Sequence, residues 1–307
     1  MSICEQMTAL FPVRKTSAQK QAFREWMITV ISGMGYAVQV EQNDQGRHHN
    51  VVVGDPEQAQ VTYTAHYDTP STILLPDLQI PRNYPVYLLW QFVILGGMLL
   101  LSLLGGIGLG ISSGNGKVTI LGFFAVFVLL MVLQMNGVAN KNNVNDNTSG
   151  VALLLETMEK IPQEERHKVA FIFFDNMEKG RKGSKAYARD HMEMQHTHFI
   201  VNADSVGVGD VFVVSAPTLA MQLPQYAALE KQLSVCHERE VCFFSSLTTR
   251  GNSDFRSFKC GVGITAYRRV PGIGLFLGKL HTSRDTAADQ RNIERLAEAF
   301  SALVREL

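Results

Sequence analysis

The sequence has no excess of charge of either sign. Its 28 Lys and Arg residues balance 28 Asp and Glu residues, so the formal net charge at pH 7 is zero. Nucleic-acid-binding domains carry a basic patch or a basic helix, and no such run of charge occurs here. We therefore predict no nucleic-acid partner.

Cysteine is scarce and unpaired. The chain has 4 cysteines, and Cys4, Cys236, Cys242 and Cys260 show neither a CxxC motif nor another paired spacing. This favours reduced, partly buried thiols over a disulfide framework, and so a reducing compartment. The N-terminus also lacks an apolar stretch followed by a cleavage site, so we do not expect the N-terminal part to be exported.

Charge is absent from two long stretches, 86–113 and 118–135, which contain about 28 and about 18 residues. Each can form a helix that crosses, or nearly crosses, a bilayer core of about 30 Å. Only four residues join them, so they must form an antiparallel hairpin whose ends emerge on one side. A pair of buried helices in a soluble core is the alternative, but neither run has the polar stripe expected of one. We predict an inserted transmembrane hairpin at 85–136.

Glycine is dense in the first of these runs, and small residues let helices approach closely in lipid. We expect close packing of the two helices at Gly96, Gly97, Gly105, Gly106, Gly108 and Gly110.

Flanking charges predict the orientation of the hairpin. Arg82 and Lys141 lie on the globular side and Lys117 lies in the turn. Positive residues favour the cytoplasmic side. We therefore predict an integral membrane protein with a cytoplasmic globular part.

Outside the hairpin, short apolar runs alternate with amphipathic segments. Residues 17–34 place apolar side chains at helical spacing after a potential N-cap at Ser17. The predicted strands cover 37–40, 50–53, 61–65, 169–174, 199–203, 211–215, 241–244 and 263–267, and further helices cover 150–158, 184–194, 224–235 and 292–307. This alternation predicts an α/β layered fold around a parallel or mixed sheet. Residues 1–84 and 137–307 would form a single discontinuous domain, because candidate ligands lie on both sides of the hairpin.

Five potential metal ligands follow strands or lie in loops. They are His66, Asp146, Glu178, Asp204 and His281. Each alone has a simple structural explanation; a loop aspartate ahead of a helix, for example, commonly caps that helix. Together they form a mixed His/carboxylate set that suits zinc, and two zinc ions can share it if one carboxylate bridges them. Carboxylates at strand ends also line the crevice where open α/β sheets bind ligands.

Several segments resemble, in order, the signatures of the dizinc aminopeptidase family, which includes bacterial leucyl aminopeptidases, glutamate carboxypeptidases and glutaminyl cyclases. The segments are Thr64–Thr69, Asn145–Val151, Phe174–Ser184, Asn202–Asp204, Ser253–Phe255 and His281–Thr286. The resemblance implies an α/β/α sandwich with a central mixed sheet. It also implies two zinc ions, one held by His66 and Asp204 and the other by Glu178 and His281, with Asp146 bridging them. Asp68 would orient His66.

The sequence departs from the family at Met177, because there the family carries the glutamate that acts as general base. Asp175 is the nearest substitute, but along a strand it would lie about 6 to 7 Å from position 177. Loss of a general base costs about 10²- to 10⁴-fold in rate, so slow hydrolysis remains physically possible.

Two functions follow from this resemblance. The first is a membrane-anchored zinc aminopeptidase that removes an N-terminal residue from a peptide substrate by attack of zinc-activated water. The second is a non-catalytic, zinc-binding pseudopeptidase that binds a peptide or protein partner. A glutaminyl cyclase also resembles the family, but such enzymes normally work with one zinc and the same acidic base. For His191, His196 and His198 we expect a solvated connection rather than another metal site.

Overall fold

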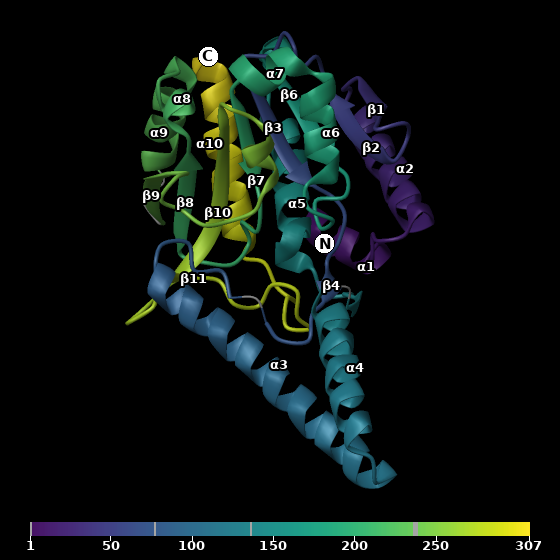
Figure 1. Cartoon of the computed structure of the whole chain (residues 1–307). Coiled ribbons are helices and arrows are strands. Elements are labelled where there is room, and N and C mark those ends of the chain that lie inside the picture. Colours follow the sequence, from purple (N-terminus) through teal and green to yellow (C-terminus); the bar gives the residue numbers. More distant parts are fainter. Residues whose placement is uncertain (1, 77, 136, 236–238) are drawn as a thin grey trace.

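The computed structural model describes residues 2–76, 78–135, 137–235 and 239–307 (Figure 1). Its centre is one large mixed sheet. From one edge to the other the strands are β1 (Val38–Asn43), β2 (His48–Val53), β6 (Val169–Phe174), β3 (Val61–His66), β7 (Ile200–Ala203), β10 (Gly261–Val270), β8 (Val211–Ala216) and β9 (Glu240–Ser245), and β11 (Gly274–Phe276) pairs with β10.

The central strands are parallel. β3 pairs in parallel with β6 and β7, and β7 pairs in parallel with β10. Every residue of β3, β6 and β7 is buried, as expected for apolar strands covered on both faces. The strand predicted at 169–174 is confirmed, and its neighbours show why it lacks polar alternation.

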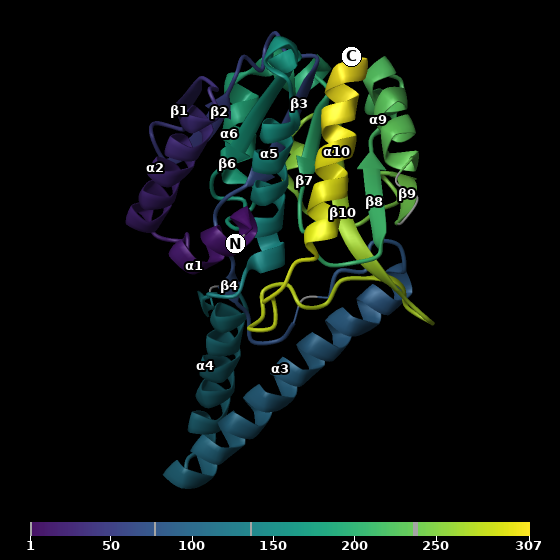
Figure 2. The ribbon, with the colours of Figure 1, turned by 180° about the vertical axis from the view of Figure 1, so that it is seen from behind.

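Helices cover both faces of the sheet. One face carries α2 (Ser17–Gly33), α5 (Ser149–Lys160), α9 (Pro224–Ser234) and α10 (Gln290–Glu306), and the other carries α6 (Lys182–Asp190) and α7 (Met192–Thr197) (Figures 1 and 2). On the first face the Tyr63 ring stacks on Phe300 with centroids 4.3 Å apart. On the second, Phe174 packs against Tyr187 and Phe258. The predicted α/β/α sandwich with a mixed sheet is therefore confirmed.

The remaining elements are short. They are α1 (Ile3–Leu10), α8 (Thr218–Met221), β4 (Ser71–Thr72), β5 (Val138–Ala139), an irregular turn η1 (Val144–Thr148) whose backbone is not helical at Asp146 and Asn147, and the 3₁₀ turns η2 (Gln163–Lys168) and η3 (Asp254–Ser257).

Two helix predictions need correction. Thr16, not Ser17, caps α2, because its hydroxyl accepts from the Gln19 N–H while the Gln19 side chain accepts from the Thr16 N–H. The helix predicted over 184–194 is two helices, α6 and α7. They are separated at His191, whose backbone is not helical (φ −120°, ψ 72°) and whose ring stacks on Tyr187.

The two apolar runs form a helical hairpin that projects from the sandwich (Figure 1). α3 (Tyr84–Ser113) has 30 residues and α4 (Gly116–Met135) has 20. In an 18-residue apolar stretch of each helix, only 22% of the residues of α3 and 6% of those of α4 are buried. These are therefore not core helices of the sandwich. β4 and β5 pair at the base of the insertion. Because the insertion follows β3, it leaves from the edge of the sheet where β3 ends.

The glycine prediction is correct only near the tip of the hairpin. A Cβ on Gly106 would lie 2.6 Å from the Thr119 carbonyl oxygen, and Gly105 and Gly110 also meet α4 closely. Gly96, Gly97 and Gly108 have nothing within 4 Å of an added Cβ, so close packing is wrong for them. The helices are tightly packed near the turn and diverge toward the sandwich.

The described cysteines Cys4, Cys242 and Cys260 are free thiols. Cys236 lies outside the described residues.

Candidate metal centre

The five predicted ligands come together at one edge of the sheet. β3 ends at His66, β6 leads into the loop that carries Glu178, and β7 is followed directly by Asp204. These strands are parallel neighbours, so their carboxyl ends meet at the same edge. Asp146 lies in η1 just before α5, and His281 lies in the loop between β11 and α10.

The side chains form two groups that share Asp146. In the first group, Nε2 of His66 lies 3.5 Å from Oδ1 of Asp146 and 3.9 Å from Oδ1 of Asp204. In the second, Nε2 of His281 lies 3.0 Å from Oδ2 of Asp146 and 3.6 Å from Oε2 of Glu178. Within each group, donor atoms lie within 4.8 Å of one another, close enough to coordinate a single ion.

Two of these donor atoms are buried without a protein partner. Nε2 of His66 and Oε1 of Glu178 have no hydrogen-bond partner among the residues that the structure describes. A buried polar atom left unpaired costs about 1–3 kcal/mol, so it usually marks a bound ion, water or ligand. Imidazole nitrogen and carboxylate oxygen are ligands that zinc prefers, and both groups therefore fit this metal.

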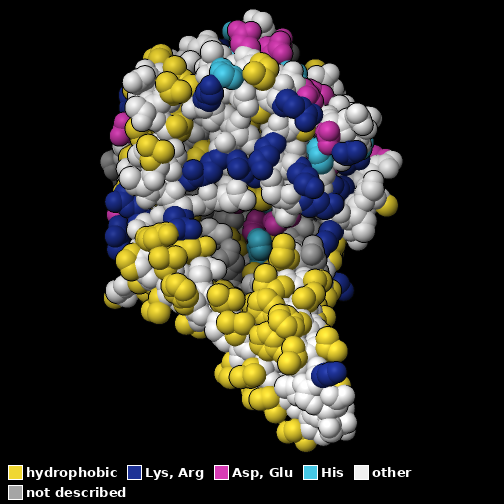
Figure 3. All heavy atoms as spheres, in the orientation of Figure 1, with side chains coloured by type: hydrophobic (Ala, Val, Ile, Leu, Met, Phe, Trp, Pro, Cys, Tyr) yellow, Lys and Arg dark blue, Asp and Glu magenta, His cyan; other side chains and the backbone are white. Residues whose placement is uncertain are grey.

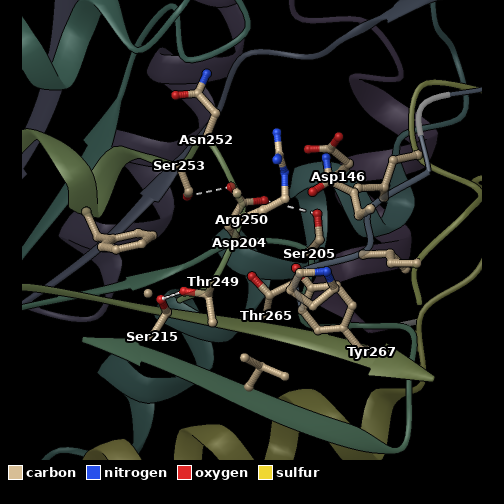
Figure 4. Close-up of a pocket in the computed structure, with 18 of the residues that line it drawn as sticks. Asp146, Asp204, Ser205, Ser215, Thr249, Arg250, Asn252, Ser253, Thr265 and Tyr267 are labelled. Carbon is tan, nitrogen blue, oxygen red and sulfur yellow. Dashed lines mark hydrogen bonds between the residues drawn. The ribbon is translucent and has the colours of Figure 1, made fainter. Parts of the chain in front are cut away.

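A second layer of side chains holds the potential ligands in place. The Asp68 carboxylate accepts the backbone N–H groups of Met177 and Glu178 at 2.9 and 3.1 Å, and its Oδ1 lies 3.4 Å from Nδ1 of His66. Asp68 therefore connects two ligand-bearing segments. Ser253 and Ser205 donate to the Asp204 carboxylate at 2.6 and 3.0 Å (Figure 4).

Asp285 is a supporting residue that the sequence reasoning missed. Its carboxylate accepts the N–H groups of Asn145 and Asp146 at 2.8 and 3.0 Å and so positions the shared aspartate. It lies four residues after His281 in a segment quoted for the resemblance, but nothing in the sequence indicated its contact with η1.

Three residues at or beside the ligands have a left-handed backbone conformation. His281 itself, Ser205 beside Asp204, and Asn176 two residues before Glu178 have positive φ values of 57°, 57° and 55°. Non-glycine residues adopt this conformation at a cost of about 1–3 kcal/mol and do so mostly at functional sites.

The buried charges shift one another's pKa values. Burial raises the pKa of Glu178 to about 8, and the neighbouring Asp146 carboxylate adds to this shift while His281 opposes it. Burial works against ionisation of Asp146 too, but the facing imidazoles of His281 and His66 outweigh it and lower the pKa of Asp146. Burial disfavours protonation of His66, yet the facing carboxylates of Asp146 and Asp68 raise its pKa. Such a cluster of buried carboxylates is suited to neutralisation by a cation.

Position 177 offers no proton acceptor, and Asp175 does not replace it. Met177 lines the cavity beside the ligands. The Asp175 carboxylate is 1% exposed, lies 2.5 Å from Nζ of Lys20 and accepts the His49 N–H. Among the described residues, the carboxylates that line this cavity are Asp146, Glu178 and Asp204, which are all potential ligands.

The cavity beside the two groups has a volume of about 220 Å³. Its far wall is rich in hydroxyl groups, with Ser215 and Thr249 hydrogen-bonded to each other and Thr265 and Tyr267 close by (Figure 4). Phe255 and Leu277 add apolar surface. The cavity can therefore hold one small or medium-sized side chain next to the metal ligands.

The remaining histidines lie apart from this centre. Nε2 of His191 lies 2.8 Å from Glu41 and its Nδ1 lies 3.1 Å from Glu57. Burial opposes protonation, but these hydrogen bonds raise the pKa of His191. Within the described part of the chain, neither His191 nor His196 nor His198 belongs to a candidate metal group.

The mixed sheet, with two candidate metal groups that share Asp146 at the carboxyl ends of its parallel strands, defines an α/β protein with a candidate metal centre. The chain belongs to peptidase family M28, because the sequence model of that family matches residues 134–304. The family prediction is therefore confirmed. A comparison with curated proteins finds no match.

Solved structures show the same fold. Glutaminyl cyclase from Porphyromonas gingivalis is similar over 99% of this chain and 97% of its own, with a TM-score of 0.62 and 16% identity. The LapA aminopeptidase from Legionella pneumophila is similar over 99% of this chain and 69% of its own, with a TM-score of 0.60 and 13% identity. A leucine aminopeptidase precursor from Bacteroides thetaiotaomicron is similar over 99% and 95%, with a TM-score of 0.60 and 13% identity. At these identities the likeness is one of fold.

Proposed function

We propose that the protein is a membrane-anchored, zinc-dependent aminopeptidase that removes the N-terminal residue of a peptide. The observation that carries the proposal is the position of Asp146. Its Oδ1 faces His66 in one group and its Oδ2 faces His281 in the other, as a bridging carboxylate requires. His66 and Asp204 would hold one zinc, and Glu178 and His281 the other.

The roles of the chain's residues follow from their contacts. Bound zinc would supply Lewis acidity and lower the pKa of water to about 7. Asp68 holds the backbone at 177 and 178 and faces His66, so it would orient both groups. The cavity of about 220 Å³ would receive the first side chain of the substrate. Similarity to solved aminopeptidases supports this substrate class.

The metal content and a matched variant test this proposal. We expect the purified protein to bind two zinc ions and to hydrolyse aminoacyl amides slowly, and we expect His66→Ala to lose one zinc ion and the activity. A protein that binds no zinc would refute it. A single zinc with cyclisation of N-terminal glutamine would indicate a glutaminyl cyclase instead.

A second function is favoured by Met177. With Asp175 engaged by Lys20, the described residues that line the smaller cavity offer no carboxylate base apart from the potential ligands. A non-catalytic relative that keeps its zinc ions and binds a peptide or protein would have this site. Zinc binding together with peptide binding but without turnover would support this function over the first.

The hairpin supports membrane anchoring. It is long and apolar, and its large side chains are exposed; Phe92 is 68% and Leu121 is 69% exposed. Such a surface needs an apolar environment. We propose that 85–136 crosses the bilayer and that 1–84 and 137–307 form one discontinuous cytoplasmic domain, in which strands from both sides of the hairpin share one sheet.

The orientation can be tested at the turn of the hairpin. In intact cells, an Asn115→Cys variant should react with a membrane-impermeant maleimide, while the parent protein should not. Labelling only after cell lysis would contradict a cytoplasmic domain.

A further inference from the structure

A second, larger cavity lies between the candidate metal centre and the hairpin. Its volume is about 620 Å³. Glu178, His281 and Asp68 line it on the side of the sandwich. On the other side its walls come from both helices of the hairpin. Most of the helix side chains there are apolar, namely Ile94, Leu95 and Met98 of α3 and Met131 and Met135 of α4, and the polar ones are Tyr87, Gln91 and Gln134.

The course of the helices creates this space. Near the turn, a Cβ on Gly122 would lie 2.9 Å from the Leu109 side chain, so the helices touch there. Closer to the sandwich, Gly96 and Gly97 face open space. Figure 1 shows the helices diverging as they approach the sheet edge that carries the ligands. The cavity therefore occupies the wide end of the hairpin.

Specific hydrogen bonds tie both helices to the segment that joins β4 to α3. The Trp90 indole N–H on α3 donates to the Pro76 carbonyl at 3.0 Å. On α4, the Gln134 side-chain amide exchanges two hydrogen bonds of 2.9 Å with the backbone of Leu75. The Ile73 N–H of the same segment donates to the His281 carbonyl at 3.1 Å, so the walls of the cavity are tied to a loop that carries a potential ligand.

The two cavities meet at the centre. Glu178 and His281 line both of them. In Figure 3, acidic and histidine side chains lie in a hollow directly above the apolar surface of the hairpin. A peptide with its first residue in the smaller cavity would have its scissile bond at the shared ligands, and its next residues would continue into the larger cavity.

We propose that the larger cavity binds the residues that follow the scissile bond, and that the substrate is a peptide whose free N-terminus is followed by an apolar segment. This rests on the proposed function. Apolar side chains of such a peptide would be buried against isoleucine, leucine and methionine side chains of α3 and α4. The hairpin is then a substrate-binding element as well as an anchor.

The test uses the zinc-loaded full-length protein in lipid bilayer discs. Its probes are an aminoacyl amide and two ten-residue peptides with the same first residue, one continuing with Leu and Ala and the other with Ser and Gly. Ile94→Trp and Met131→Trp would fill the cavity. Val93→Trp and Val132→Trp are matched controls, because these neighbours are 53% and 48% exposed and do not line it.

We expect kcat/KM to be higher for the apolar than for the polar peptide by about tenfold or more. The kcat/KM for the apolar peptide, divided by the kcat/KM for the aminoacyl amide, should fall by a similar factor in the two cavity variants. This ratio should stay unchanged in the two controls. A benzophenone at the third residue of the apolar peptide should crosslink to α3 or α4 in the parent protein. The crosslink tests whether the peptide occupies the larger cavity even if a cavity variant fails to fold.

The outcomes separate this inference from the proposed function. If no probe is hydrolysed but the apolar peptide binds and crosslinks to the hairpin, the peptidase proposal fails and the cavity assignment stands. If both peptides are hydrolysed equally and the crosslinks lie elsewhere, the peptidase proposal stands and the cavity assignment is overturned. Absence of both hydrolysis and hairpin crosslinks also overturns it.

Discussion

Restoring a carboxylate at position 177 should increase hydrolysis sharply. Met177 lines the cavity beside Glu178, and its backbone N–H is held by the Asp68 carboxylate at 2.9 Å. A glutamate there would place a proton acceptor beside the metal ligands without a change of backbone. Met177→Glu replaces one unbranched side chain of similar length by another, so the cavity should accept it.

The size of the effect follows from what the site lacks. General-base catalysis contributes about 10²- to 10⁴-fold, or about 2.7 to 5.4 kcal/mol of transition-state stabilisation. The cavity has no acceptor to share the role, because the carboxylates of described residues that line it are the potential ligands and Asp175 is paired with Lys20. We therefore expect Met177→Glu to raise kcat by about 10²-fold or more.

The assay compares Met177→Glu with Met177→Gln, which has the same shape but accepts no proton at neutral pH. Both variants are loaded with zinc, and release of product from aminoacyl amides is followed. The glutamine variant should remain at the parent rate. Equal rates for the glutamate and glutamine variants, at full zinc content, would refute the argument that a missing base limits this site.

Three further predictions concern metal binding and stability. Asp146→Ala should reduce the bound zinc to near zero, whereas Asp204→Ala should leave about one ion, because only Asp146 belongs to both groups; equal losses measured by elemental analysis would contradict a bridging role. Lys20→Met leaves the Asp175 carboxylate, which is 1% exposed, without its charged partner. Chemical denaturation should then show that the free energy of unfolding falls by roughly 3–5 kcal/mol. The control Gln21→Met, at an exposed position, should show almost no change. The folded-state pKa of His191 is raised, so its contribution is complete below the unfolded value of about 6.5 and is lost as pH rises through the folded value. The stability loss caused by His191→Gln should therefore be larger at about pH 5.5 than at about pH 9, by less than about 1 kcal/mol, because the lost ring contact with Tyr187 counts equally at both pH values. An equal loss at both pH values would contradict this.

Local patterns predicted most of the elements. The buried strand at 169–174 and the two apolar helices were predictable because uninterrupted apolar runs have few alternative structures. Helix ends were less predictable. The side chain of Gln19 completes the cap at Thr16, and contacts with Tyr187 and two distant glutamates interrupt the helix at His191.

The sequence by itself determined the alternation of strands and helices, the hairpin and the residue types of the five potential ligands, because each depends on local composition and spacing. Only the tertiary structure decided how these parts meet. Parallel pairing of β3, β6 and β7 brings His66, Glu178 and Asp204 to one edge, and Asp146 presents one oxygen to each group. The divergence of α3 and α4 toward that edge could not be predicted from the sequence either, because it depends on packing between residues far apart in the chain.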